Sequence, residues 1–373
     1  MITISLCLIV KDEEQTLARC LNSVKSAVDE IIIVDTGSTD KTKSIAATYT
    51  DNVYDFTWIN DFAAARNFAF SQATQDYLLW LDADDVLLDS DVQELLLLKQ
   101  NCDSTVDSFT MNYNLSFDES GNVVSSLRRN RLVKRSKNFR WIGAVHEYLE
   151  VSGKIINSDV SVTHKKEKHD TYDRNLTIYE NRLANGESFS PRDLYYYANE
   201  LNDHKMYERA VEYYQKFLNT ELGWLEDNIS TCGKLADCFS FLNNDQNKLK
   251  YIYKSFEYDI PRAEFCCRLG YHFLNLKKYL QAIFWYKIAT QLEKPKDHVA
   301  LLNYACWTWL PHLQLCVCYS NIGEVELAYK HNKIAESYAP NNPSVIYNKS
   351  YFNKILKNEE DESSFIFDKP DVP

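Results

Sequence analysis

The chain has 373 residues, more than one ordinary hydrophobic core needs and enough for two or three domains. Hydrophobic residues make up 45% and charged residues 25%, a composition typical of a soluble globular protein. The formal net charge of −12 argues against broad binding to nucleic acid or to an anionic membrane. A single bound phosphate group remains compatible with this charge, because a metal ion or a helix terminus can hold it.

Two strand–helix units open the chain. Residues 3–10 are apolar and β-branched and predict a buried strand, which is followed by a helix with Leu17 and Leu21 on its apolar face. A second strand, 31–34, ends in Asp35-Thr36-Gly37-Ser38-Thr39-Asp40. A strand, an acid, a glycine turn and a helix start together indicate a nucleotide-binding turn. We expect the next helix over 40–49 and a short strand over 53–56.

The third unit ends in carboxylates. Residues 61–73 predict a helix that carries Arg66 and Asn67, and 78–81 predict a buried strand that runs into Asp82-Ala83-Asp84-Asp85. On an extended backbone Asp82 and Asp84 would face the same side. Acids at the carboxyl end of a parallel strand lie at the ligand crevice, where Mg²⁺ or Mn²⁺ can bind carboxylates and phosphate. The alternative is a strand that ends in a solvated acidic turn.

The pattern changes after a further helix at about 90–100. Residues 108–162 alternate between strands and turns, with a hairpin turn expected at Gly121-Asn122. From about 172 the pattern is helical. The three apolar strands joined by helices predict a mostly parallel, Rossmann-like sheet with right-handed crossovers.

Small residues recur through the helical half. The spacings are 38, 34 and 46 residues between Ala198, Ala236, Gly270 and Cys316. An alanine stands twelve residues after the first, third and fourth of these, at Ala210, Ala282 and Ala328. A period near 34 with small residues at helix crossings is the tetratricopeptide signature. Lys248 stands where a fourth alanine is expected, and the alternative is a helical bundle without repeats.

Ten cysteines show no paired zinc-site spacing. Residues 2–10 are apolar but lack a basic leader and a small-residue cleavage site, so we expect no signal peptide and no integral membrane segment. The cysteines are therefore expected to be reduced and mostly buried, in a cytoplasmic protein.

The first half of the chain resembles a family 2 glycosyltransferase of the GT-A fold. The resemblance covers about 1–165, with the motifs in the family's order. With a tetratricopeptide part behind it, the chain is similar to the protein- and peptide-modifying branch, which includes bacteriocin S-glycosyltransferases that modify a cysteine. The motifs are Ser5-Leu6-Cys7-Leu8-Ile9-Val10-Lys11-Asp12-Glu13-Glu14, Ile33-Val34-Asp35-Thr36-Gly37-Ser38-Thr39-Asp40, Ala65-Arg66-Asn67, Leu81-Asp82-Ala83-Asp84-Asp85 and Trp141-Ile142-Gly143-Ala144-Val145-His146-Glu147.

The fold class expected is an α/β GT-A catalytic domain over 1–170, followed by an all-α tetratricopeptide-like domain over 171–357 and a mobile acidic tail over 358–373.

The metal site is assigned to three residues. Asp84 is the expected direct ligand of Mn²⁺ or Mg²⁺, and the resemblance places Asp82 nearer the ribose and the metal-bound water. His164 follows the strand 160–163 and is a further candidate ligand for metal or diphosphate, with lysines at 165, 166 and 168 to neutralise phosphate. A purely structural histidine is the alternative.

The nucleotide-sugar site is expected from residues on the same strand ends. Val10 and Glu13 would flank the base, while Asp35, beside Gly37, would accept hydrogen bonds from base or ribose. Arg66 would reach a phosphate or Asp82. Ala83 and Trp141 complete the set, Trp141 against the sugar ring or in the core. Alternatives are a helix N-cap for Asp35, ordinary helix-terminal charge for Glu13 and a surface ion pair for Arg66.

Inverting transfer needs a base that takes the proton of the attacking acceptor. The candidates are Glu147, Asp85 and His146. Glu147 follows Trp141 and Gly143, which the resemblance places near the acceptor end of the donor pocket, and it is favoured because a carboxylate can activate a hydroxyl or a thiol. A thiol acceptor, with its lower pKa, would depend less on this base.

The function expected is transfer of a sugar from a nucleotide-diphosphate sugar, with UDP as the favoured nucleotide, to Cys, Ser or Thr of a peptide or protein held by the helical repeats. Two alternatives stay open: a transferase for cell-envelope polysaccharide or lipid-linked sugar, and a scaffold without catalysis. The tyrosine-rich helical surface could also form a homodimer.

Overall fold

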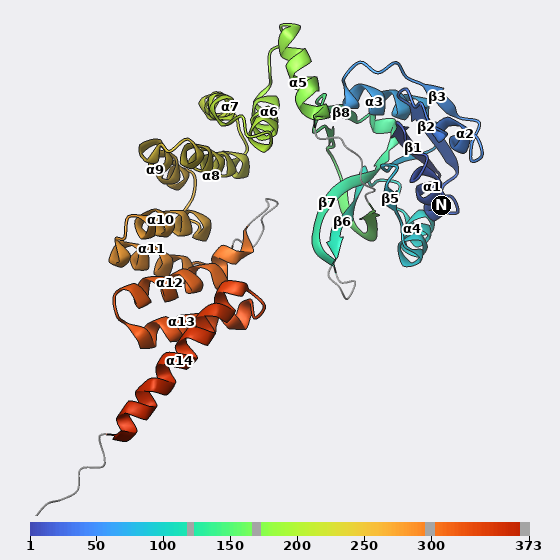
Figure 1. The fold of residues 1–373 in the computed structure, drawn as a ribbon. Helices are drawn as coiled ribbons and strands as arrows, with labels where there is room; N and C mark the ends of the chain where they lie inside the picture. Colours follow the sequence, from blue (N-terminus) through green and yellow to red (C-terminus); the bar gives the residue numbers. More distant parts are fainter. Residues whose placement is uncertain (118–122, 166–172, 295–302, 366–373) are drawn as a thin grey trace, which may run out of the picture. The chain divides into compact units, whose positions relative to one another are not determined.

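The computed structural model describes residues 1–117, 123–165, 173–294 and 303–365 (Figure 1). The chain forms two compact units, Met1–Phe189 and Ser190–Pro373. Helix α5 (Arg174–Ala184) belongs to the first unit, so the division falls after this helix, whereas we expected it near 170. The turn expected at Gly121-Asn122 lies outside the described residues. None of the helices in the described ranges has both the length and the apolar character needed to cross a bilayer.

The first unit is built on an eight-stranded sheet with the strand order β3-β2-β1-β4-β7-β6-β10-β5. Strands β1 to β4 run parallel, β7 lies antiparallel to both β4 and β6, and β10 is parallel to β6. A two-stranded ribbon, β8–β9, is separate from this sheet. The strands are β1 (Ile4–Val10), β2 (Glu30–Asp35), β3 (Val53–Asp55), β4 (Tyr77–Trp80), β5 (Asp85–Val86), β6 (Ser108–Phe117), β7 (Val123–Lys134), β8 (Arg140–Ile142), β9 (Tyr148–Glu150) and β10 (Ile155–His164).

Helices cover both faces of the sheet. Alternate residues of β1, among them Leu6 and Leu8, pack with α1 (Leu17–Val24) and α4 (Asp89–Asn101) in one core. Cys7 points to the other face, where α3 (Phe62–Gln72) and the ribbon form a second core. The fully apolar parallel strands predicted for residues 3–10 and 31–34 are confirmed, because a strand buried on both faces has no polar side to expose.

Two predicted elements differ from the structure. The helix expected over 40–49 is only α2 (Thr42–Ala46), because the chain then tightens into turns in which Thr48 and Tyr49 donate to carbonyls three residues back. Residues 82–85 are not extended: the Asp85 amide donates to the Asp82 carbonyl at 3.0 Å and closes a turn. The expectation that Asp82 and Asp84 share one side of a strand is therefore wrong.

The second unit consists of helices that pack in consecutive pairs, α6 with α7, α8 with α9, α10 with α11 and α12 with α13 (Figure 1). Short 3₁₀ turns, η2 (Ser255–Glu257) and η3 (Tyr304–Trp307), interrupt the connections. The helices are α6 (Pro191–Asp203), α7 (Tyr207–Asn219), α8 (Leu225–Phe241), α9 (Asp245–Lys254), α10 (Ala263–Asn275), α11 (Tyr279–Gln291), α12 (Trp309–Asn321), α13 (Val325–Tyr338) and α14 (Pro343–Phe365).

The small residues predicted at helix crossings are buried where paired helices meet. Ala198 and Ala210 are fully buried on α6 and α7. Gly270 on α10 lies so close to the ring of Tyr286 on α11 that a Cβ would come within 2.7 Å of it. This arrangement confirms the tetratricopeptide pattern and excludes the bundle without repeats. The wide spacing before Cys316 corresponds to the segment between α11 and α12 that contains η3.

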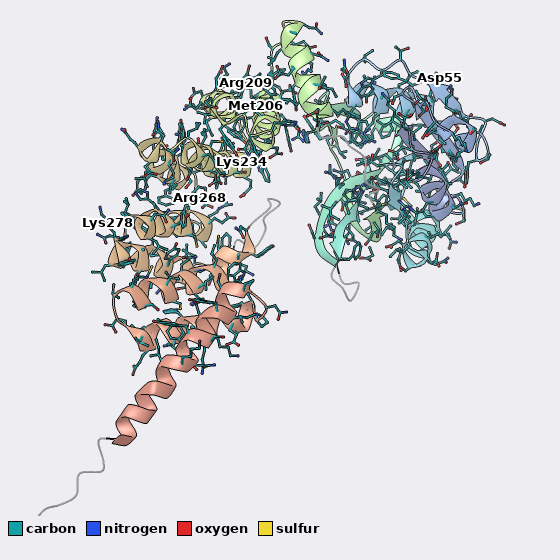
Figure 2. The ribbon with its side chains drawn as sticks, viewed as in Figure 1. Asp55, Met206, Arg209, Lys234, Arg268 and Lys278 are labelled. Carbon is teal, nitrogen blue, oxygen red and sulfur yellow. The ribbon has the colours of Figure 1, made fainter. Side chains whose placement is uncertain are left out.

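A shallow hollow of about 240 Å³ lies over α8 and α10 in this second unit. It is lined by charged side chains, among them Lys234 and Arg268, which Figure 2 labels on the two helices. Its carboxylates are Glu226, Asp237 and Glu264, and the first two are paired with arginines of the same lining.

Helix α14 extends to Phe365, so residues 358–365, expected within a mobile tail, are helical. Glutamate and lysine have good helix propensity, which lets the helix continue through this acidic segment. Residues 366–373 lie outside the described ranges.

Candidate active site

A cavity of about 600 Å³ opens where β1, β2 and β4 end in the first unit. This is the edge at which open α/β sheets bind ligands, and the volume suits a small-molecule ligand. Eight of the residues predicted for the site line it: Val10, Glu13, Arg66, Asp82, Ala83, Asp84, Glu147 and His164. The sequence motifs that supply them are separated by up to 154 positions, and the fold brings them to one place.

Arg66 lies between two carboxylates. Its Nη2 is 2.7 Å from Oδ1 of Asp82, and its Nε is 2.7 Å from Oε1 of Glu147. The guanidinium also lies over the rings of Trp80 and Trp141, at 5.1 and 4.8 Å. Because Arg66 is 9% exposed, the surface ion pair considered for it is wrong. Arg66 instead fixes the distance between the end of β4 and the ribbon.

Asn67, the next residue on α3, holds the ribbon directly. Its amide nitrogen donates to the carbonyl of Trp141 and its oxygen accepts from the Trp141 amide, both at 3.0 Å. The Phe62 amide donates to the Ala144 carbonyl at 2.9 Å. Asp61 caps α3 by accepting from Ala64 at 2.8 Å, which sets where the helix begins. These contacts place Glu147 on the wall of the cavity.

The turn at 82–85 sends its three carboxylates in different directions. Asp82 contacts Arg66, whereas Asp84 lies 3.5 Å from Nδ1 of His164. Asp85 points into the protein, where Oδ2 meets Nη1 of Arg131 at 3.0 Å and accepts the Asp82 amide at 3.0 Å. Asp85 is fully buried and does not line the cavity, so its candidacy as the base does not fit the structure.

His164 closes this corner of the cavity. Its Nδ1 lies 2.9 Å from the Tyr113 hydroxyl and 3.4 Å from Oδ1 of Asp85. The hydrogen bond with Asp85 raises the pKa of His164 against the opposing effect of burial. Ligand atoms of Asp84, Asp85 and His164 all lie within 4.8 Å of one another, a spacing that a single metal ion could bridge.

The carboxylates at this corner differ in pKa. Burial raises the pKa of Asp84, the charges of Asp82 and Asp85 raise it further, and His164 partly opposes them. Burial also acts on Asp82, but Arg66 and Arg131 outweigh it and lower the pKa of that carboxyl. Asp84 is therefore only partly compensated, by His164, and a divalent cation beside it would supply what is missing.

The second strand end carries an acceptor without a partner. Oδ1 of Asp35 accepts from the amides of Gly37 and Ser38, at 3.0 and 2.9 Å, and Gly37 has φ +106°. Oδ2 of Asp35 is buried and has no hydrogen-bond partner within the described ranges. The N-cap alternative is wrong, since α2 begins after Lys41. Asp35 and Gly37 lie behind the cavity wall, to which Thr36 contributes directly.

The loop that carries Glu13 is tied to the loop after β2. Oδ1 of Asp12 accepts from the Thr39 amide, and the Glu13 amide donates to the Thr42 hydroxyl, both at 2.7 Å. Asp12 adopts φ +54° in this connection. The two loops therefore form one rigid wall.

Besides Asp35, Gly37 and Asp85, two further predicted residues do not reach the cavity. Trp141 is buried in the core, edge-on to Trp80 at 4.7 Å, which agrees with its core alternative. His146 has φ +51° and does not line the cavity. The lysines expected at 166 and 168 lie outside the described residues.

The sequence analysis missed three contributors: Arg131, Tyr113 and Arg174. Arg174 begins α5, lines the cavity and lies 4.8 Å over the ring of Phe62. Arg131 and Tyr113 come from β7 and β6, where the strand pattern mixes polar and apolar residues. The one sequence feature that could have indicated Arg131 is its position directly before the apolar pair Leu132-Val133, within the strand.

Comparison with known families agrees with this geometry. Residues 5–148 match the family described as Glycosyl transferase family 2, so the chain contains a domain of that family. The SPbeta prophage-derived glycosyltransferase SunS of Bacillus subtilis is 27% identical over 236 residues, which cover 58% of this chain and 53% of that protein. A TPR repeat-containing protein of Synechococcus elongatus is 50% identical over 88 residues, 24% of this chain and 22% of that protein. The chain thus matches from about a fifth to about half the length of these curated relatives.

Among solved structures, glucosyl-3-phosphoglycerate synthase from Mycobacterium tuberculosis, in complex with Mn²⁺ and UDP-glucose, is similar with a TM-score of 0.34 and 17% identity. That similarity covers 51% of this chain and 81% of the synthase. YrrB, a TPR protein with an unusual peptide-binding site, gives a TM-score of 0.36 at 16% identity and covers 48% of this chain and 84% of YrrB.

Proposed function

We propose that this protein is a metal-dependent, inverting glycosyltransferase that moves a sugar from a nucleotide-diphosphate donor, UDP-linked in the first instance, to a side chain of a peptide or protein. One observation carries the proposal. A single cavity at the strand ends contains a partly compensated carboxylate, Asp84, beside His164, and a second carboxylate, Glu147, held by Arg66. The family 2 domain over 5–148 supports the same reaction class.

Asp84 and His164, with Asp82 nearby, would hold Mn²⁺ or Mg²⁺. Oxygen and imidazole ligands suit these cations. Because Nδ1 of His164 faces Asp85 and Tyr113, Nε2 is the nitrogen left to act as a ligand. When bound, the cation supplies Lewis-acid neutralisation of the leaving diphosphate.

The wall opposite this corner would bind the nucleoside. Val10 and Glu13 would flank the base, and the buried Oδ2 of Asp35 is an acceptor that a base amide or a ribose hydroxyl can satisfy. The tied loops 11–14 and 38–42 keep this wall in place before the ligand arrives, which lowers the ordering cost of binding.

Glu147 is the proposed base. Arg66 holds Oε1, and Oε2 has no hydrogen-bond partner within the described part of the chain, so it can accept the acceptor's proton as the new bond to the anomeric carbon forms. The bond between this carbon and the diphosphate oxygen breaks on the opposite face. His146, the other candidate considered, does not line the cavity.

The helical unit would hold the acceptor. Stacked helix pairs present extended surfaces suited to peptides, and the charged hollow over α8 and α10 is the place where we expect such contacts. The same surface could mediate a homodimer. A cytoplasmic location is consistent with ten free cysteines, nine of them buried.

Donor hydrolysis and transfer give the test. The protein is incubated with UDP-sugars in Mn²⁺ or Mg²⁺, with and without EDTA, and UDP release is measured by chromatography. We expect release to need the metal and to be lost in Asp84→Ala, while Asp51→Asn, an exposed acid outside the cavity, keeps it. Metal-independent release would contradict the metal assignment, and labelling of a lipid but not a peptide fraction would contradict the acceptor class.

A further inference from the structure

Beneath the cavity lies a fully buried arginine, Arg131, on β7. Its Nη1 contacts Oδ2 of Asp85 at 3.0 Å and the carbonyl of Trp80 at 3.2 Å. Its guanidinium is sandwiched between the rings of Trp80 and Tyr113, at 3.8 and 4.4 Å. The Trp80 carbonyl belongs to the last residue of β4, so Arg131 is attached to the strand from which the acidic turn departs.

Asp85 connects Arg131 to two residues of the cavity, Asp82 and His164. The oxygen that meets Arg131 also accepts the amide of Asp82, which fixes the start of the turn. The other oxygen faces Nδ1 of His164 at 3.4 Å. Tyr113, which packs on the arginine, meets the same nitrogen with its hydroxyl at 2.9 Å. Arg131 thus supports both the acidic turn and the imidazole without lining the cavity.

Stability alone does not account for this arginine. Its Nε and Nη2 are buried and have no partner within the described residues. Burying an ion pair commonly stabilises less than apolar side chains of the same volume would, and unsatisfied donors add to the cost. Local costs of this kind are typical of groups retained for a site.

We infer that Arg131 is a positioning residue that sets the affinity of the cavity for the divalent cation, acting through Asp85 on Asp82 and His164. The inference rests on the proposed function, since it concerns the same cation. Partners behind metal ligands orient them, and their loss typically weakens metal binding by about 10- to 100-fold.

The test measures Mn²⁺ binding to the full chain by calorimetry, with UDP present, and thermal unfolding of the metal-free protein. Arg131→Lys keeps the charge but loses the planar contact with both rings. Arg131→Met combined with Asp85→Asn removes both charges, so it folds even where the single Arg131→Met leaves Asp85 unpaired. The single variant Asp85→Asn shows how much of any change in Mn²⁺ affinity comes from Asp85 and not from Arg131. Arg128→Met is the matched control, because Arg128 is on the same strand and bonds to Thr110 and Ser158 away from the cavity.

We expect Arg131→Lys to bind Mn²⁺ about tenfold more weakly, and the double variant up to about 100-fold more weakly, with metal-free unfolding temperatures near that of the parent. The Mn²⁺ concentration for half-maximal activity should rise by the same factors, while kcat at saturating Mn²⁺ recovers. A merely structural role would lower the active fraction without moving this concentration.

Parent-like Mn²⁺ affinity in Arg131→Lys, with the whole loss seen in Asp85→Asn, would overturn the inference and make Asp85 a direct ligand. Absence of Mn²⁺ binding by the parent protein would instead overturn the metal assignment itself.

Discussion

The two units of this protein differ in how completely their charged groups are paired. In the helical unit Arg262 meets both oxygens of Glu226, at 2.7 and 2.8 Å, and Arg268 meets both oxygens of Asp237, at 3.1 and 2.6 Å. Each pair joins α8 to α10. In the sheet unit, by contrast, Arg131 and Asp35 keep buried atoms without partners.

This difference distinguishes charged groups that hold the structure together from charged groups that support the candidate site. Satisfied bidentate pairs between repeats hold neighbouring helices in register. Charged groups that are buried behind one cavity with incomplete partners are costly, and groups that carry such a cost are typical of functional sites. If the contrast is correct, charge removal should abolish cleavage of the donor in the first unit and leave cleavage of the donor unchanged in the second.

The largest effect is expected at Asp84. Asp84→Ala removes the proposed metal ligand and should reduce transfer by about 1,000-fold, since metal neutralisation of the leaving group supplies several kcal/mol and roughly 1.4 kcal/mol corresponds to a tenfold change in rate. UDP release at saturating donor measures it. Activity within about tenfold of the parent would place the cation elsewhere and break the contrast.

A matched pair of arginine variants compares the units directly. Arg66→Met removes a buried guanidinium that pairs with Asp82 and Glu147. Arg262→Met removes one that pairs with Glu226 and Asp259. Both should lower the free energy of unfolding, by about 3 kcal/mol, because unpaired acids remain. Urea unfolding followed by circular dichroism measures this loss.

The pair should diverge in catalysis. The Arg262→Met protein, assayed well below its unfolding midpoint, should release UDP from the donor like the parent, whereas Arg66→Met should be inactive. Equal activity in the two would remove Arg66 from the site.

Glycine variants probe packing in the helical unit alone. Gly270→Ala forces a Cβ to within 2.7 Å of the Tyr286 ring and should cost about 1–3 kcal/mol of stability. At Gly233 a Cβ meets Arg268 at 3.5 Å, an ordinary contact, so Gly233→Ala should stabilise its helix by up to about 1 kcal/mol. Thermal unfolding should shift in opposite directions for the two. Shifts of the same sign would contradict the described packing.

The smallest effect is a pH dependence from His331. Burial, with His312 and two lysines nearby, lowers its pKa from 6.5 to about 4 in the folded protein. Between these values the unfolded chain binds more protons, so the free energy of unfolding should fall as the pH is lowered. Urea titrations at pH 7 and pH 5 measure it, and His331→Asn should make the dependence weaker. His164 has the opposite shift, so its contribution is full below pH 6.5 and is lost as the pH rises through its raised pKa.

The sequence predicted the elements whose patterns are local. Continuous apolar runs identified β1, β2 and β4, and Asp61 followed by an Ala-rich segment identified α3, because these signals lie within one turn or one strand. The repeat spacing likewise located Ala198 and Gly270 against neighbouring helices.

The errors concern long-range contacts. Asp82-Ala83-Asp84-Asp85 fits an extended strand or a turn equally well, and the turn forms because Asp85 finds Arg131, 46 positions later, to neutralise it. No residue near Arg131 in the sequence indicates that Asp85 is its partner. The sequence also singled out Asp35, but its buried oxygen without a partner emerges only from the folded loops.

The two hydrogen bonds between Asn67 and the main chain of Trp141 let a side-chain amide take the place of a neighbouring strand. The two bonds join α3 to the ribbon in the way that a pair of backbone hydrogen bonds joins two strands of a sheet. Moving the ribbon away from α3 must break both bonds together. The gap between Arg66 and Glu147 is consequently set by a neutral group that salt and pH do not affect. Changes in the chain beyond β9 should therefore leave the position of Glu147 unchanged.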